Sequence, residues 1–138
     1  MTQRVSACYD QLELVDNQLG LLSEPCRTVI IVSTAVGIIG NGGLQYFFEM
    51  NFDDEPPYAV FVDAFHRVGL SDIADRLAGL VAFFPFESPH RSPQLRQQFL
   101  DAHHADFDAA MGQLEDLVFA LDTEPLLELY IESAAPAA

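Results

Sequence analysis

The apolar residues of this chain recur at helical spacing along most of its length. In residues 5–22, Leu12, Val15, Leu19 and Leu22 lie three or four positions apart, with acidic and amide side chains between them. This spacing places the apolar side chains on one face of an α-helix. The segments 58–68 and 71–81 show the same pattern and also predict helices.

The centre of the chain carries its most apolar run. Residues 29–39 are rich in β-branched side chains and could form a buried strand. We predict a buried helix instead, because no other segment offers a partner strand. Gly40-Asn41-Gly42-Gly43 follows directly. It predicts a tight reversal between two helices, with Asn41 capping the second one.

The C-terminal part has the longest regular pattern. Leu100, Phe107, Leu114 and Leu121 recur every seven residues within residues 94–122. They predict one long amphipathic helix, with Gly112 as the place where it could bend. A short helix over residues 124–133 and an Ala/Pro tail at residues 134–138 complete the chain. The fold class predicted is therefore all-α, with one domain of about seven helices over residues 1–133.

The two cysteines, Cys8 and Cys26, are too few for a disulfide scaffold. On consecutive antiparallel helices, Cys8 would lie about three turns from the connecting loop, so a bridge would be difficult to form. We therefore predict free buried thiols in a reducing cytoplasm. The first residues carry no apolar leader, and the apolar run at 29–39 is shorter than the ~20 residues that span a bilayer. We expect a cytoplasmic protein with no membrane partner.

The charge balance narrows the possible functions. The chain has 21 acidic residues against 6 arginines and no lysine, for a formal net charge of −15. Nucleic-acid binding needs a basic surface, and docking on an anionic membrane needs one too. Nucleic acids and membranes are therefore excluded as partners. Acidity alone can simply keep a protein soluble.

The positions of the acids add to this picture. Glu124, Glu128 and Glu132 lie four residues apart, so a helix would space them by ~6 Å along its axis. That spacing is of the order of neighbouring phosphate separations in nucleic acid. A second line and an acidic loop supply the other candidates: Asp101, Asp108, Glu115, Asp122, Asp53, Asp54 and Glu55. These acids form either a solvated face or a surface for a basic partner.

Candidate catalytic chemistry is sparse. Asp101 and His104 have the i, i+3 spacing of di-iron helices, and His103 adjoins them. A di-iron site needs two such motifs and two more carboxylates. Glu87 and His90 have the same spacing but enclose Pro89 in a predicted loop, and His66 with Asp63 three positions earlier is typical of a surface pair. The glycines at 40–43 lack the Lys-Ser/Thr pair of a phosphate loop. We predict no metal, no cofactor and no enzymatic activity, and keep a small metal-dependent enzyme using His103 and His104 as a third hypothesis.

Several segments together resemble a known family. Asn41-Gly42-Gly43-Leu44-Gln45-Tyr46-Phe47-Phe48, followed by Asn51, resembles the Asn-Gly-Gly-aromatic-x-x-Phe-Phe hallmark of the bacterial DNA-mimic protein family. This domain was first catalogued as one of unknown function. Leu44 replaces the usual aromatic residue, and Tyr46 stands where a polar residue is common. Residues 64–69 with 73–74, and residues 114–122 with 126–131, resemble its later helices, so the resemblance covers roughly residues 20–133.

The resemblance implies an all-α homodimer without catalytic residues. Its acidic side chains would imitate the phosphates of duplex DNA and occupy the DNA-binding face of a basic protein, such as a transcription repressor. The family motif carries over to Asn41, Gly42, Gly43, Phe47 and Phe48, whereas the mimicking acids follow no fixed motif. A second hypothesis is an immunity-type cap that covers a basic toxin or enzyme with the same acids.

Overall fold

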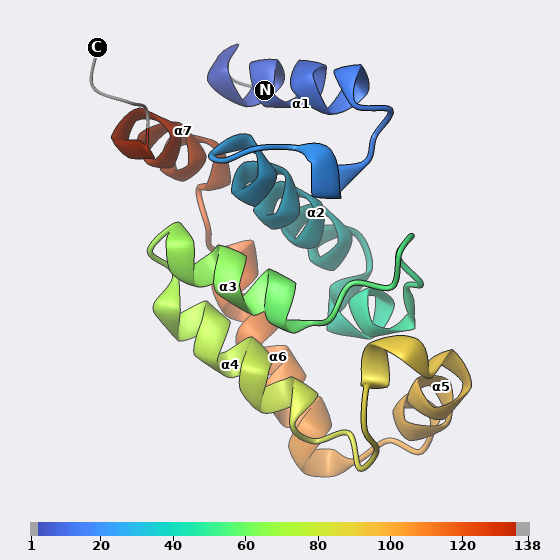
Figure 1. Ribbon diagram of the computed structural model, residues 1–138. Helices are drawn as coiled ribbons and strands as arrows, with labels where there is room; N and C mark the ends of the chain where they lie inside the picture. The colour runs from blue at the N-terminus through green and yellow to red at the C-terminus, as the bar shows by residue number, and fades with distance from the viewer. Residues whose placement is uncertain (1–2, 135–138) are drawn as a thin grey trace.

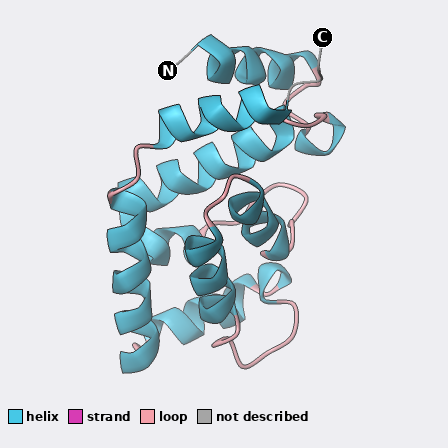
Figure 2. Cartoon of the chain, turned by 90° about the vertical axis from the view of Figure 1, so that its left-hand side faces the viewer, coloured by secondary structure: helices cyan, strands magenta, loops and turns pink. Residues whose placement is uncertain are grey.

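Helix α2 (Cys26–Glu49) runs through the middle of the structure, and five other helices pack against it (Figure 1). The computed structural model describes residues 3–134, which contain seven α-helices and no strand (Figure 2). The other helices are α1 (Gln3–Leu14), α3 (Ala59–Arg67), α4 (Ser71–Val81), α5 (Pro93–Asp101), α6 (Ala105–Phe119) and α7 (Thr123–Ala134), with 3-10 helices at Leu19–Leu21 and Pro89–Arg91. The prediction of an all-α single domain is confirmed. Of the predicted tail, Ala134 ends α7, and residues 135–138 lie outside the described residues.

The β-branched run of the sequence forms the buried first part of α2. By length and composition alone this helix could cross a membrane, with a mean hydropathy of 1.4 over its most apolar window. Eleven of its residues are buried, and it packs against α1, α3, α5, α6 and α7. An apolar helix enclosed by other helices is the ordinary core of a helical domain.

The sequence predicted that the glycine-rich segment reverses the chain, and this prediction is wrong. Helix α2 continues through Gly40, Asn41 and Gly42, bends at Gly43 and then resumes. Asn41 therefore lies exposed inside the helix and does not cap the next one. Gly43 has a φ of 74°, and a Cβ there would lie 2.5 Å from a carboxylate oxygen of Glu115. A Cβ on Gly42 would lie 2.6 Å from that of Tyr46. The two glycines thus permit a close bend within one helix.

Two adjacent phenylalanines form the centre of the core beyond this bend. Phe47 and Phe48 are fully buried. Phe47 meets the ring of Phe61 in α3 at 5.1 Å, and Phe48 meets the rings of Phe84 and Phe107 at 5.3 and 5.9 Å. These contacts join α2 to α3, α6 and the segment after α4. These two side chains therefore connect the helices at the centre of the core.

The long helix predicted for residues 94–122 is two helices. Helix α5 ends at Asp101 and α6 begins at Ala105, because His103 takes a left-handed φ of 54° and His104 is extended. Leu100 and Phe107 are both buried, so the apolar repeat persists across the break. A seven-residue repeat of apolar positions indicates that these side chains are buried on the same side of the chain. It does not require that they belong to one continuous helix. Helix α6 runs through Gly112 without a break.

The prediction of free thiols is wrong, since Cys8 and Cys26 form a disulfide with Cα atoms 5.0 Å apart. Helix α1 ends at Leu14, well before the predicted end at residue 22. The connection to α2 turns at Asp16 and Asn17, which both have positive φ, and passes through a 3-10 helix. This connection places the middle of α1 over the first residue of α2. The distance between the two cysteine Cα atoms is therefore within the normal range for a disulfide. The cytoplasmic location rested partly on free thiols and stays a prediction.

We expect Gly43→Ala to lower the free energy of unfolding by about 2 kcal/mol or more, because alanine is strained at this φ and its Cβ would displace Glu115. The measurement is chemical denaturation followed by circular dichroism. Gly79→Ala is the matched control, since Gly79 lies in α4 and a Cβ added there would meet no neighbouring atom within 4 Å. That variant should be stabilised by about 1 kcal/mol. Equal effects at both glycines would contradict the strain at Gly43.

Candidate partner-binding surface

The acidic loop between α2 and α3 presents three candidate residues. Asp53, Asp54 and Glu55 are exposed, and within the described residues they form no ion pair. Phe52 anchors the loop by packing on Phe61, with ring centroids 5.0 Å apart. Asp53 and Asp54 also line an apolar hollow of about 280 Å³ between this loop, α2 and the chain after α1. The loop therefore holds carboxylates beside apolar surface.

The three candidate acids of α7 lie on one helix, as the sequence predicted, but two of them share a basic partner. The backbone N–H of Arg4 donates to Glu128 at 3.1 Å, and its guanidinium contacts both Glu128 and Glu132. The pKa of Arg4 is raised above its ordinary value, chiefly by the hydrogen bond to Glu132 and by the charge of that carboxylate. Glu124 lies in the first turn of α7, where the helix dipole favours an acid. Arg4 is 124 positions from Glu128, so the local pattern gave no sign of this contact.

The predicted second line of acids is divided among three segments. Asp101 ends α5 and accepts a hydrogen bond from Gln97 at 2.9 Å. Asp108 lies in the first turn of α6, with His103 Nδ1 3.7 Å from its carboxylate. Asp122 is exposed in the connection between α6 and α7. The break at His103 separates Asp101 from the rest, so these acids do not form one helical stripe.

Glu115 is half-buried and holds the bend of α2. Its carboxylate accepts the backbone N–H of Leu44 at 2.8 Å, directly after the bend at Gly43. A helix leaves its first N–H groups without intrahelical acceptors, and a side-chain oxygen can supply one. The sequence placed Glu115 among the surface acids because its spacing matched theirs. Its contact with Leu44 gives it a structural role.

One of the six arginines is buried in the core. The sequence pattern did not predict this position. Arg96 is 2% exposed. It donates to the carbonyl oxygens of Phe48 and Pro89 at 2.9 and 2.7 Å, and to the side chain of Asn51. None of these partners is a carboxylate. Arg76 pairs with Asp72 on the surface of α4. Few arginines are thus left to offset the surface acids.

The histidines of the third hypothesis do not converge on a ligand site. His104 stacks on Phe99, with ring centroids 4.2 Å apart, and His103 faces Asp108. Residues 3–134 contain no group of three or more His, Cys, Asp or Glu side chains that could hold a metal ion. The stacking instead fixes the connection between α5 and α6. The geometry gives no support for a hydrolytic centre at these residues.

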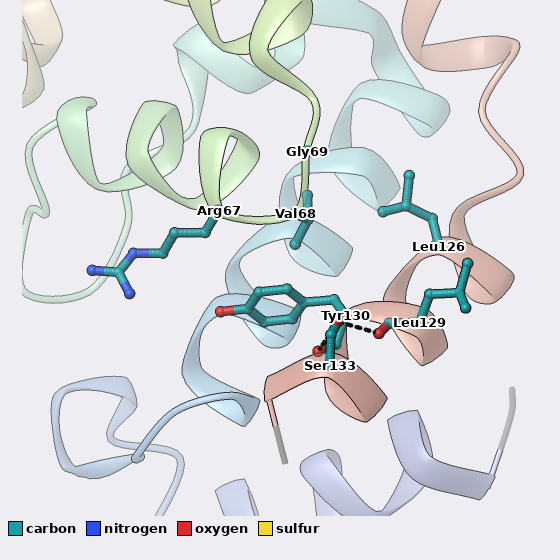
Figure 3. A pocket seen from close by; sticks show the side chains of 7 residues that line it. All are labelled: Arg67, Val68, Gly69, Leu126, Leu129, Tyr130 and Ser133. Carbon is teal, nitrogen blue, oxygen red and sulfur yellow. Dashed lines mark hydrogen bonds between the residues drawn. The ribbon is translucent and has the colours of Figure 1, made fainter. Parts of the chain in front are cut away.

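The largest of the described hollows lies between the end of α3 and α7 (Figure 3). It measures about 500 Å³ and is lined mostly by apolar side chains, among them Val68, Leu126 and Leu129, with Arg67 at its edge. Leu129 is 65% exposed. The hydroxyl of Ser133 donates to the backbone of its own helix. The lining therefore suits apolar contact better than catalysis.

The fold and this surface define a class: an all-helical acidic domain with exposed carboxylates around a core centred on α2. A family model described as DMP19-like protein matches residues 20–134, and the chain belongs to this family. The match includes α2 to α7 and leaves α1 outside. No curated protein and no solved structure matches the chain.

We expect Arg96→Met to lower the free energy of unfolding by about 3 kcal/mol, because it leaves buried carbonyl oxygens without donors. Arg91→Met removes the same charge from an exposed side chain five residues earlier and should change stability by about 0.5 kcal/mol or less. Thermal and chemical denaturation of both variants make the comparison. Similar losses would show that the effect comes from net charge.

Proposed function

We propose that this protein is a non-enzymatic acidic binding protein that occupies the DNA-binding surface of a basic protein, such as a transcription regulator. Membership of the DMP19-like family supports this function. The observation that carries it is the excess of acids on the surface, with one of only six arginines buried away from it. A fold that needed only solubility would gain little from so large an imbalance.

The arrangement of the acids supplies the chemistry. Acids one helical turn apart on α7 have an axial spacing of ~6 Å, comparable with neighbouring phosphates. The acidic loop at Asp53, Asp54 and Glu55 adds a second group on another part of the chain. A protein that binds DNA phosphates with arginines and lysines would bind carboxylates at similar spacing. Duplex DNA would then compete with this protein for the same partner.

A homodimer in the cytoplasm belongs to the same proposal. Exposed apolar side chains on two neighbouring helices, Phe119 at the end of α6 and Leu129 in α7, supply surface for such an association. Phe119 is 56% exposed and Leu129 is 65% exposed. A dimer would double the number of carboxylates that one partner can contact.

A cap for a basic toxin or enzyme is the second candidate. It is favoured by the position of Asp53 and Asp54 beside an apolar hollow. Such a patch suits a compact basic surface with an apolar centre. Competition by duplex DNA separates the two candidates, because DNA would displace the partner of a mimic and leave a capped toxin bound.

The test is capture of partners from the native lysate at low salt, with elution by rising salt or by duplex DNA. We expect a DNA-binding protein that duplex DNA displaces and whose affinity falls steeply with salt. Asp53→Asn with Asp54→Asn should weaken this binding about tenfold, at roughly 0.7 kcal/mol for each lost charge contact.

The control is Glu87→Gln with Asp116→Asn, which removes the same charge from exposed positions outside the candidate set. Those changes should leave the affinity within about twofold. An equal loss in both double variants, or binding that is insensitive to salt, would contradict the proposal.

A further inference from the structure

Helix α1 is held on the molecule by few contacts, and the disulfide is the strongest of them. Val5 and Cys8 are its only buried residues within 3–14, and Tyr9 and Leu12 are partly buried against the core. Tyr9 forms a hydrogen bond with Ser33 of α2 at 2.8 Å, and Arg4 contacts Glu128 and Glu132 on α7. A helix of twelve residues is marginal by itself in water. Without the bridge, α1 belongs among the least stable parts of the fold.

The rest of the fold is complete without α1. Apart from Val5 and Cys8, the buried apolar residues all come from residue 22 onward. The family match begins at residue 20, after α1 has ended. Figure 1 shows α1 at one end of the molecule, alongside α7 and the start of α2. Loss of α1 from its place would therefore leave the core formed by α2 to α7.

Helix α1 covers part of the acidic surface that the proposed function uses. It packs against α7, and Arg4 offsets the charges of Glu128 and Glu132. Two of the three candidate acids on α7 are thus in contact with a cation while α1 is in place. A basic partner would have to compete with Arg4 for these carboxylates.

A cavity leads to the bridge. It measures about 260 Å³ and is lined by both Cys8 and Cys26, with Arg4 and Ile131 at its sides. The exposed fractions of Cys8 and Cys26, 1% and 6%, include the surface that faces this cavity. A small thiolate, the form that attacks disulfides, would reach the sulfur atoms from this side when α1 opens locally.

We propose that Cys8–Cys26 is a thiol-exchangeable bridge that holds α1 beside α7, and that its reduction releases α1 and removes Arg4 from Glu128 and Glu132, so that a basic partner can contact them. A small thiolate attacks one cysteine sulfur and forms a mixed disulfide, and the other cysteine leaves as a thiolate that takes up a proton. A second thiol then resolves the mixed disulfide. The products are two cysteine thiols and one disulfide of the small thiol.

The release of α1 can be measured without any partner. Hydrogen–deuterium exchange of the full chain, with and without dithiothreitol, should show exchange in residues 3–14 that is about tenfold faster or more after reduction. Exchange in α3 and α4 should stay the same. Cys8→Ser with Cys26→Ser should match the reduced protein and show no response to dithiothreitol. Equal protection of α1 in the oxidised and reduced protein would overturn the proposal.

The effect on the acids is measured with a nona-arginine peptide at low salt, followed by fluorescence anisotropy. Reduction should tighten binding several-fold, and Glu128→Gln with Glu132→Gln should remove this gain. Arg4→Gln should give part of the gain in the oxidised protein. If α1 is released and the affinity for the peptide does not change, the proposed effect of α1 on Glu128 and Glu132 is overturned.

This regulation rests on the proposed function for its biological meaning, but the two can fail separately. If no partner from the lysate is displaced by duplex DNA, the proposed function fails. The exchange and peptide measurements then still decide whether the bridge controls α1 and the acids beneath it.

Discussion

The arrangement of the helices depends on one hydrogen bond, from the backbone N–H of Leu44 to the carboxylate of Glu115. The bend at Gly43 interrupts α2, so the helix restarts with N–H groups that lack intrahelical acceptors. Glu115 supplies an acceptor from α6, and a negative charge is favourable at the positive end of a helix. The same contact fixes α6 against α2 at the point where Phe47 and Phe48 enter the core. The packing of α3 and α6 around these rings follows from the position of the bend.

Arg96 binds the other end of the helical segment that begins at Leu44. It donates to the carbonyl oxygens of Phe48 and, at 3.4 Å, Met50, where the second part of α2 terminates. A short helical segment over residues 44–49 thus has a carboxylate at its start and a guanidinium at its end, which matches the helix dipole at both. The residues from Asn41 to Phe48 lie in or beside this segment. Their role in the structure is to form the bend and the core, which says little about the function that the surface performs.

The sequence predicted what depends on local periodicity and missed what depends on distant contacts. The spacing of the apolar residues was sufficient to predict that α3, α4 and α7 exist. The bend at Gly43 escaped prediction because its geometry is completed by Glu115, which lies 71 positions beyond Leu44. The disulfide escaped because the connection after α1 turns back instead of continuing the helix. For the candidate surface, spacing correctly placed Glu124, Glu128 and Glu132 on one helix, but it could not show which acids face inward or meet Arg4.

Net charge is consequently a poor measure of the surface that a partner would meet. Glu115 contributes to the total of 21 acids, yet it acts inside the fold, and Arg96 contributes to the total of 6 arginines without offsetting any carboxylate. Glu128 and Glu132 share Arg4, while Asp53, Asp54 and Glu55 face solvent from a loop. The acids thus fall into two groups that differ in their dependence on α1. Binding through the loop needs no change in Arg4, although Leu12 of α1 lines the hollow beside Asp53 and Asp54. Binding through Glu128 and Glu132 requires Arg4 to give up its contacts.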